Sequence, residues 1–484
     1  MVDEAVRASY ETVIGLEIHL QLSTQTKAYS SEHYEYGELP NSQTSVITLG
    51  HPGTLPVPNM QVVDFAVKLG LALNCDIARK MYYARKNYFY ADLPKGYQIT
   101  QDLTPICRGG FVDISWDGGE KRVNLTRIHM EEDAGKSIHD QDPFHTLVDL
   151  NRAGVPLLEI VSEPEMRSGE EAYAYLTEIR KLVRYLGICD GNMEEGSLRC
   201  DANISVRKRG ETAFGTRTEV KNMNSIRNVQ RAIDFEAQRQ IEIIESGGKI
   251  HQETRSFDAT NGSTFSLRSK ELAHDYRYFP EPDISPLELS EELILKIKAE
   301  LPELPNDLIK KYTTQFGLSE YDAKIISEER EFAAYYEEAI KNSTHYKPVA
   351  NWLITGVRSY LNQRAIKIDR FPLSAENLSK LVQMIEDGKI SHTTATQKIF
   401  PFIVDENLDP LSFASKNNLL QDTSEDEIKQ LAQAALDKYP EKVLEYKNGN
   451  KNLLGLFMGE FMKAAKGKAD PKKANQILRS LLES

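Results

Sequence analysis

The hydrophobic pattern of the chain changes near residue 290, and this change most restricts the folds available to it. Before this point, short runs of alternating apolar and polar residues are separated by Gly, Pro and Asn. After it, apolar residues recur at the three- and four-residue spacing of amphipathic helices. Strand-like and helix-like periods in separate parts of one chain predict an α+β protein, in which a sheet domain precedes a helical region.

The segment VIGLEIHLQL has the clearest strand pattern in the chain. Its apolar side chains alternate with Glu17, His19 and Gln21, which is typical of a strand with one buried face. The runs Cys200–Val206 and Thr218–Asn222 alternate in the same way. These strands predict that the first domain is built on a largely antiparallel sheet.

Helix signals divide the rest of the chain. We expect two helices among the strands, one starting at the capping box of Ser168 and Glu171 and one starting near Ser225. The helical patterns of the second part cover Glu291–Glu300, Asp307–Gln315, Ser319–Asn342, Ala350–Asn362 and Ala375–Asp387. Three domains are therefore predicted: a sheet domain at 1–290, an all-α domain at 291–412 and a small helical tail at 413–484.

The overall charge of the chain does not favour binding to nucleic acid. A net charge of −13 does not steer a chain toward RNA, so any such binding needs a local basic patch. The C-terminal tail supplies the candidate, with lysines at Lys463, Lys466, Lys468, Lys472 and Lys473.

Cysteine usage and hydropathy indicate the compartment. The four cysteines form no CxxC pair and no zinc spacing, which fits a reducing cytoplasm. No secretory signal pattern and no run of about 18 apolar residues occurs, so we expect neither export nor a membrane span.

Acidic residues supply the first candidate chemistry. Glu17 and His19 lie two apart on a strand and project to the same side, where they would suit a divalent cation that also binds phosphate. A solvated sheet face is the alternative. Glu159 stands inside the apolar run Pro156–Val161 and needs a buried partner. That partner is either an arginine such as Arg152 or a metal ion.

A second acidic run is Glu131–Asp133. A strand would send Glu131 and Asp133 to one side and Glu132 to the other. The sequence AGKS follows, but the spacing of a phosphate-binding P-loop is absent. No nucleophile elbow or catalytic cysteine context occurs either, so the chain is not expected to carry a catalytic nucleophile of its own.

Longer phrases carry a family resemblance. VIGLEIHLQLSTQTKAYS, RKNYFYADLPKGYQITQ, HMEEDAGKS, EEGSLRCDANISVR and HDYRYFPEPDI resemble the B subunits of aspartyl/glutamyl-tRNA amidotransferases. The C-terminal phrase LLGLFMGEFMKAAKGKADPKKANQILRSLL is similar to the YqeY-type tail of that family. The resemblance covers nearly the whole chain.

The resemblance implies a carbon–nitrogen ligase that takes its amido group from glutamine. ATP and Mg²⁺ would phosphorylate the side-chain carboxylate of Glu or Asp carried on a misacylated tRNA, and ammonia would then displace the phosphate. An amidase-type A subunit and a small C subunit would complete a cytoplasmic heterotrimer. The sheet domain would be a glutamine synthetase-like cradle, and the tail would bind tRNA. The alternative is a non-catalytic tRNA-binding scaffold subunit.

The resemblance also assigns residues. Its matching phrases place the magnesium and kinase centre on Glu17, His19, Glu132 and Glu159. Lys86 matches a residue of the ammonia route. Residues expected to line the site are Asp201, Asn203, Glu219 and Lys221. Many members carry zinc-binding cysteines where this chain has Ser30, Glu32, Ser45 and Thr48, so no zinc is expected.

Overall fold

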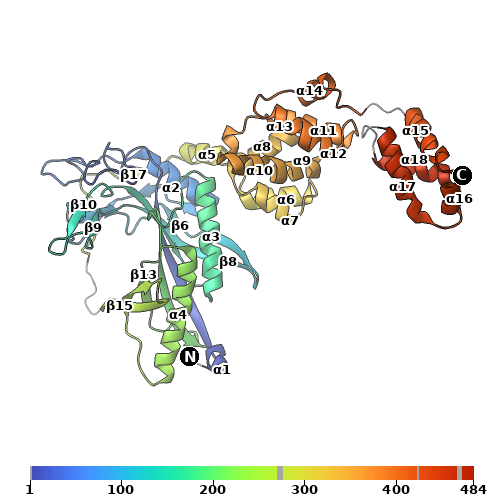
Figure 1. Cartoon of the computed structure of the whole chain (residues 1–484). Coiled ribbons are helices and arrows are strands. Elements are labelled where there is room, and N and C mark those ends of the chain that lie inside the picture. Colours follow the sequence, from blue (N-terminus) through green and yellow to red (C-terminus); the bar gives the residue numbers. More distant parts are fainter. Residues whose placement is uncertain (1–2, 270–275, 422–424, 466–470, 484) are drawn as a thin grey trace. The chain divides into compact units, whose positions relative to one another are not determined.

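The computed structural model describes residues 3–269, 276–421, 425–465 and 471–483 (Figure 1). It divides into two compact units, Met1–Leu304 and Pro305–Ser484. Unit 1 holds the strands and unit 2 is helical, which confirms the predicted α+β class.

Unit 1 is organised by one ten-stranded sheet. Its main path runs in the order β15-β14-β13-β12-β1-β11-β8-β6-β2, and β7 pairs with β8 beside it. The pairing of β13 with β14 is parallel, and the other pairings in this sheet are antiparallel. The strands are β1 (Tyr10–Gln21), β2 (Asp76–Ile77), β6 (Cys107–Arg108), β7 (Phe111–Trp116), β8 (Gly119–Glu132), β11 (Pro156–Ser162), β12 (Leu198–Lys208), β13 (Thr218–Lys221), β14 (Glu253–Asp258) and β15 (Ser263–Ser269).

Three small sheets flank the large one. They pair β9 with β10, β3 with β17, and β4 with both β5 and β16. Their strands are β3 (Lys80–Met81), β4 (Ala84–Asn87), β5 (Tyr97–Thr100), β9 (Lys136–Ile138), β10 (Leu147–Asp149), β16 (Phe279–Pro280) and β17 (Leu287–Glu288).

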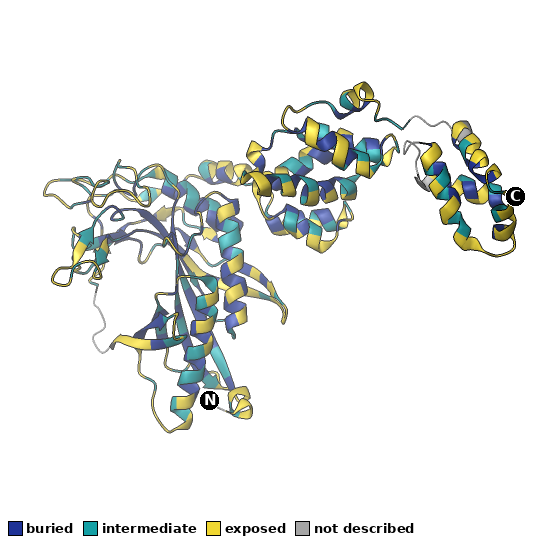
Figure 2. Cartoon of the chain, in the orientation of Figure 1, coloured by how far each residue is buried: buried dark blue, intermediate teal, exposed yellow. Residues whose placement is uncertain are grey.

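One face of the large sheet forms the core of unit 1. Ile14, Leu16, Ile18 and Leu20 of β1 are completely buried, in one cluster with side chains of α2 (Met60–Ala72), α3 (Gly169–Tyr185) and α4 (Ile226–Glu245). Figure 2 shows the buried stripes along these elements. Burial of such a side chain contributes about 2 kcal/mol each. The opposite face therefore carries the polar half of each alternating strand.

The two helices expected among the strands are confirmed. Ser168 caps α3 by accepting a hydrogen bond from the backbone N–H of Glu171, and Ser225 caps α4 in the same way. The expectation of only two such helices is wrong, because α2 is also present. Its signals were the cap of Asn59 and the apolar residues from Val62 onward.

Helix α5 (Glu291–Glu300) has its predicted bounds, but it packs with the sheet domain. Ile294 and Ile297 join the core of unit 1, so this unit continues past the boundary expected at residue 290. A short α1 (Glu4–Ala8) precedes β1.

Unit 2 begins with a set of short helices. They are α6 (Pro305–Thr314), α7 (Glu320–Ile326), α8 (Arg330–Ile340), α9 (Tyr346–Trp352), the π-helix η1 (Leu353–Val357), α10 (Arg358–Arg364), the 3₁₀ helix η2 (Ile368–Arg370), α11 (Ala375–Glu386), α12 (His392–Thr394), the π-helix η3 (Ala395–Ile399), α13 (Phe400–Ile403) and α14 (Pro410–Lys416). The single helix predicted over Ser319–Asn342 is wrong. Ile326 and Phe332 are both buried although they lie six positions apart, and the backbone becomes extended at Glu329 so that both reach the core.

The tail has its own core. Buried residues from Ile428 to Leu482 pack α15 (Glu425–Asp437), α16 (Pro440–Lys447), η4 (Lys451–Leu453), α17 (Leu454–Ala464) and α18 (Pro471–Glu483) together. The sequence predicts the start of α15 from a capping box of Ser424 with Glu427, and Ser424 lies outside the described residues. No described helix has the length and apolar character needed to cross a membrane.

Glu236 of α4 joins four elements of unit 1 and gives a test of this packing. Its buried carboxylate accepts hydrogen bonds from Thr218 and Thr264 and pairs with Arg239 and Arg255. Because Glu236→Ala leaves buried cations short of a partner, we expect unit 1 to lose about 3 kcal/mol of unfolding free energy. Denaturant unfolding followed by Trp116 fluorescence, in a Trp352→Phe background, measures it.

The matched control is Glu245→Ala on the same helix. This change removes an exposed ion pair with Lys208 of β12. Its effect should be much smaller, because solvent screens exposed pairs. Equal losses in the two variants would contradict the role assigned to Glu236.

Candidate functional site

Strand register gathers the candidate residues on the polar face of the large sheet. His19 of β1 lies opposite Glu159 of β11, and Glu159 lies opposite His129 of β8. On the other side of β1, Glu17 lies opposite Asp201 of β12. Paired residues project to the same face of a sheet, so segments far apart in the sequence meet here.

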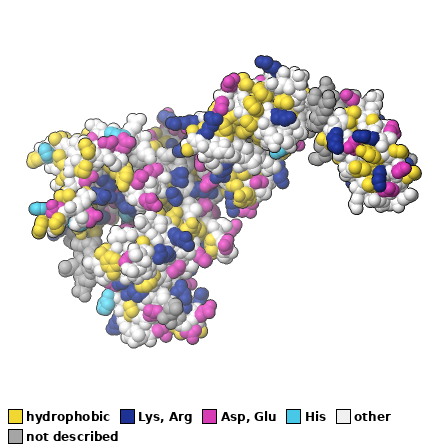
Figure 3. Space-filling model, in the orientation of Figure 1, with side chains coloured by type: hydrophobic (Ala, Val, Ile, Leu, Met, Phe, Trp, Pro, Cys, Tyr) yellow, Lys and Arg dark blue, Asp and Glu magenta, His cyan; other side chains and the backbone are white. Residues whose placement is uncertain are grey.

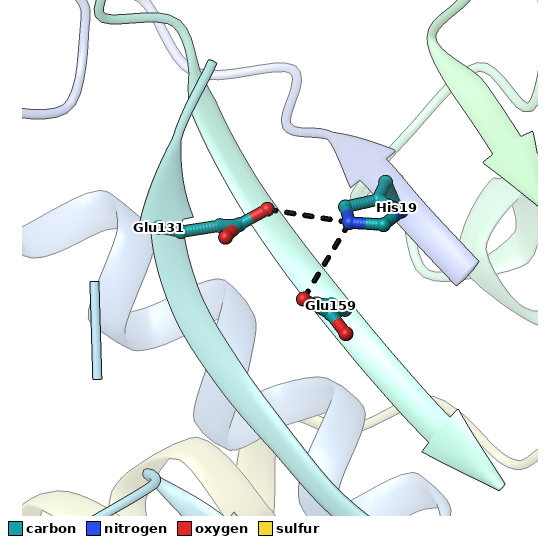
Figure 4. Close-up of side chains that lie close together, drawn as sticks. All are labelled: His19, Glu131 and Glu159. Atoms are coloured by element: carbon teal, nitrogen blue, oxygen red, sulfur yellow. Dashed lines mark ion pairs between the residues drawn. The ribbon is translucent and has the colours of Figure 1, made fainter. Parts of the chain in front are cut away.

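The first cluster consists of His19, Glu131 and Glu159 (Figure 4). The His19 Nε2 atom lies 3.5 Å from a carboxylate oxygen of Glu131 and 3.5 Å from one of Glu159. His129 lies behind them, with its Nε2 atom 3.1 Å from Glu159. One ligand atom from each member of the cluster falls within 4.8 Å of the others, which is a spacing that a cation can bridge.

The second cluster consists of Glu17, Asp201 and Glu219. Asn203 donates a hydrogen bond of 2.8 Å to Glu17, and Lys221 pairs with both Asp201 and Glu219. All four residues predicted to line the site, Asp201, Asn203, Glu219 and Lys221, therefore lie on this face.

The clusters concentrate negative charge. Burial, with repulsion from Glu159, Asp201 and Glu219, raises the pKa of Glu17. Burial alone would lower the pKa of His19, but its bond to Glu159 and the charge of Glu131 raise it to about 9. Burial opposes ionisation of Glu159, and the two histidines still hold its pKa well below the ordinary value.

Arginine also lines this face. Arg199 lies opposite His19 and donates a 2.7 Å hydrogen bond from Nη1 to Asp133. Gln21 donates to the same carboxylate oxygen at 2.9 Å, and Arg152 lies 3.6 Å from it. Burial would raise the pKa of Asp133, but the two arginines hold it below its usual range. Asp133 thus fixes Arg199 beside the first cluster.

Lys86 approaches the first cluster from the small sheet of β4. Its Nζ atom lies 4.9 Å from the ring centroid of Tyr276 and 5.9 Å from that of Tyr88. Burial would lower the pKa of Lys86, but the charges of Glu131 and Glu159 raise it. Lys86 is therefore a cation held between two aromatic rings and close to two carboxylates.

Glu132 is placed differently from its predicted partners. It projects to the other side of β8, where Lys95 pairs with it and the backbone N–H of Ile99 donates to it at 2.8 Å. The structure brings Glu131 into the cluster instead. The alternative pairing of Glu159 with Arg152 is wrong, since Arg152 reaches Asp133.

The four positions at which the sequence predicts no zinc binding form one hydrogen-bonded group, made of Ser30, Glu32, Ser45 and Thr48. Thr48 donates to Glu32 and lies 3.4 Å from the hydroxyls of Ser30 and Ser45. The fully buried Lys27 reaches Glu32 at 3.7 Å and donates to the Gln43 carbonyl. Burial lowers the pKa of Lys27 to about 8. Hydrogen bonds and an ion pair among hydroxyl, carboxylate and ammonium groups therefore stabilise this loop.

The tail lysines are only partly covered by the structure. Lys463 and Lys473 are exposed, and Lys463 pairs with Glu460 at 3.0 Å. Lys466 and Lys468 lie outside the described residues, as does the side chain of Lys472. Elsewhere the surface in Figure 3 intersperses cationic with anionic side chains.

His129, Glu131, Asp133 and Arg199 are site residues that sequence reasoning did not assign. The alternation of β8 does place His129, Glu131 and Asp133 on one side, but only the pairing with β11 shows that this is the side of His19.

The donor sets suit a divalent cation. The second cluster is made only of carboxylates, which Mg²⁺ prefers, while the imidazole of the first is also a ligand for softer divalent ions. Carboxylates that repel each other in a partly buried site are stabilised by such an ion.

Comparison with known proteins finds relatives over nearly the whole chain. Residues 12–295 match the family model described as the GatB/GatE catalytic domain, and residues 334–482 match the GatB domain. A protein of Chlorobium chlorochromatii is 48% identical over 98% of this chain and 99% of its own length. One of Pelagibacter ubique is 46% identical over 98% and 97%. Both relatives are named as the B subunit of an aspartyl/glutamyl-tRNA(Asn/Gln) amidotransferase.

The neighbouring acids Glu131 and Glu132 offer a matched test. Glu131→Gln should weaken binding of Mn²⁺, used as a probe for divalent cations, by about 10-fold or more, because it removes a charged ligand. Glu132→Gln should leave the affinity within about twofold. Electron paramagnetic resonance titration of free Mn²⁺ measures both, and a larger effect of Glu132→Gln would reverse the assignment.

Proposed function

The chain belongs to the family of aspartyl/glutamyl-tRNA(Asn/Gln) amidotransferase B subunits, and from this premise we propose that it activates the carboxylate of a misacylated aminoacyl-tRNA with ATP. It is thus one component of a multi-subunit tRNA-dependent amidotransferase. The proposed reaction phosphorylates the side chain of Glu-tRNA(Gln) or Asp-tRNA(Asn). Ammonia then forms the amide of Gln-tRNA(Gln) or Asn-tRNA(Asn).

The observation that carries this proposal is the pair of clusters on one sheet face. Glu17 and His19 lie two residues apart on β1, about 7 Å along the strand. His19 belongs to the first cluster and Glu17 to the second. Side by side, the two clusters suit a polyphosphate and a reacting carboxylate. A scaffold that only bound tRNA would have no need to gather five carboxylates together.

The chemistry requires an activated carboxylate. A carboxylate is a poor electrophile toward ammonia, and phosphorylation gives it a leaving group. Bound Mg²⁺ would neutralise the charge of the phosphate oxygens during transfer. The carboxylates of both clusters would hold that ion, and Arg199, fixed by Asp133, would attract the negative substrate groups and orient them beside His19.

The ammonia is proposed to come from a partner. The sequence has no recognisable nucleophile for glutamine hydrolysis, so an amidase-type A subunit would supply it, with a small C subunit completing a heterotrimer in the cytoplasm. Lys86 lies between Tyr88 and Tyr276 and close to Glu131 and Glu159, a position suited to the last part of the ammonia route.

Loss of one shared ligand tests the kinase role. Glu159→Gln in the assembled complex should lower ATP-dependent amidation by about 100-fold or more, because it removes a ligand that His19 and His129 also orient. Amide formation on misacylated tRNA is measured together with glutamine hydrolysis without tRNA. Hydrolysis should stay within about twofold.

Full amidation by Glu159→Gln would favour the alternative of a tRNA-binding scaffold. Loss of hydrolysis as well would mean that the complex, and not the site, had been damaged.

Removal of the tail tests its proposed role in tRNA binding. A chain that ends at Gln421 should bind tRNA about 10-fold more weakly at moderate salt, with a shallower dependence of affinity on salt, because phosphate contacts are lost. Filter binding over a salt series measures this. Glutaminase activity in the complex is the control and should not change. Equal affinities of the two chains would refute the role.

A further inference from the structure

A hollow of about 350 Å³ opens at the start of β1, toward the end of the strand that lies away from the carboxylate clusters. It is bordered by α1, the first residues of β1 and α4 (Figure 1). Its volume falls within the range of small-ligand pockets, which begins at about 300 Å³. The described residues that line it include three arginines, Arg7, Arg167 and Arg209, and two carboxylates, Glu4 and Glu11.

The three arginines come from separate segments, and each is anchored by a hydrogen bond to the protein. Arg7 of α1 donates a 3.2 Å bond from Nη1 to Gln238 of α4. Arg209, which follows β12, donates a 2.7 Å bond from Nε to the Ala8 carbonyl. Arg167 donates from Nη1 to two backbone carbonyls of its own loop, at 2.9 and 3.0 Å. These bonds involve one nitrogen of each guanidinium, which has three nitrogens and five N–H donors, so the groups are fixed in place and can still donate to a ligand.

Positive charge exceeds negative charge around the hollow. The carboxylate of Glu11 is already bound by Arg207, with an Nη2–oxygen distance of 2.6 Å. This bond lowers the pKa of Glu11, and although burial opposes the shift, the charges of Arg167 and Arg209 lower it further. Together with Arg207, the lining residues supply four guanidinium groups against two carboxylates. This excess occurs in a chain whose net charge is −13, so it forms a local basic patch outside the tail.

The chemistry of the lining fits a phosphate group. Guanidinium groups that converge on one hollow repel each other, and a bound anion removes this repulsion. The planar guanidinium donates two parallel hydrogen bonds to phosphate oxygens. Thr12 lines the same hollow, and its hydroxyl is a further donor. A phosphate offers three donors more oxygens, and as a monoester more negative charge, than a carboxylate does.

The hollow is separate from the proposed reaction centre. Glu11 lies six residues before Glu17 on β1, which corresponds to about 20 Å along the strand. A phosphate held beside Glu11 therefore lies too far from the clusters to take part in phosphoryl transfer or amide formation there.

We propose that this hollow binds a phosphate group that is not the reacting one. The phosphate belongs either to the backbone of the tRNA or to a small phosphorylated molecule, and both sources present the same oxygens to the arginines. The proposal goes beyond the reaction proposed above, because no step of that reaction uses the hollow. If tRNA is the source, unit 1 contacts RNA in addition to the tail.

The test uses the assembled complex with the double variant Arg7→Gln/Arg209→Gln. Both side chains are exposed, so folding should be retained. The matched control is Arg122→Gln/Arg227→Gln, which removes the same charge from two exposed arginines of unit 1 that do not line the hollow. A second variant, Arg7→Lys/Arg209→Lys, keeps both charges and loses the guanidinium geometry.

Two affinities are measured. Calorimetry with pyrophosphate as the probe is done in EDTA, so that no divalent cation links the probe to the carboxylate clusters. Filter binding of unacylated tRNA is done over a salt series. We expect the glutamine variant to lower at least one of these affinities by about 10-fold or more, the size of lost hydrogen bonds to a charged group. The control should stay within about twofold for both.

A weaker tRNA affinity, with a salt dependence reduced by about one to two ion contacts, assigns the hollow to the RNA backbone. A loss of pyrophosphate binding with unchanged tRNA affinity assigns it to a small phosphorylated molecule. Unchanged values for both ligands would overturn the proposal, as would equal losses in the control. The lysine variant should lose less than the glutamine variant. Equal losses in these two would mean that packing and not charge had been removed, which would also overturn the proposal.

Discussion

The site depends on the antiparallel register of β1 with its two neighbours. β11 and β12 each pair with β1 along the residues that carry Glu17 and His19, so five carboxylates from five strands face one side. A shift of β1 by one residue would turn Glu17 and His19 into the apolar core, where they would have no partners. The buried face, with Ile14 to Leu20 packed under the helices, therefore fixes the chemistry of the other face.

Charge on this face is sorted along the strands. The carboxylate clusters lie along the second half of β1, Lys221 balances the cluster of Glu17, and Arg199 lies next to His19. Asp133 differs from the cluster acids in its partners. It has two arginines beside it and stays ionised, whereas Glu17 faces other acids and has a raised pKa. Neighbouring acids thus differ in role because their partners differ.

The sequence was sufficient to predict those features of the fold that depend on the local pattern of residues. The alternation around Glu17 and His19 predicted their shared side, and the caps at Ser168 and Ser225 predicted two helix starts. It was insufficient to predict which residues meet when this depends on the pairing of strands. Three consecutive acids do not reveal which of them lies beside His19. The segment that resembles the family pointed to Glu132, whereas the pairing of β8 with β11 brings Glu131 to His19. The break after Ile326 likewise follows from packing, because continuous helix propensity hides it.

The loop group of Ser30, Glu32, Ser45 and Thr48 has a consequence for the conditions in which the fold persists. A metal site made of thiolates is lost when oxidants attack the sulfur or when chelators remove the metal. Hydroxyls and a carboxylate that surround the Lys27 ammonium are open to neither reaction. The loop between β1 and α2 thus keeps its shape under oxidising and metal-poor conditions alike.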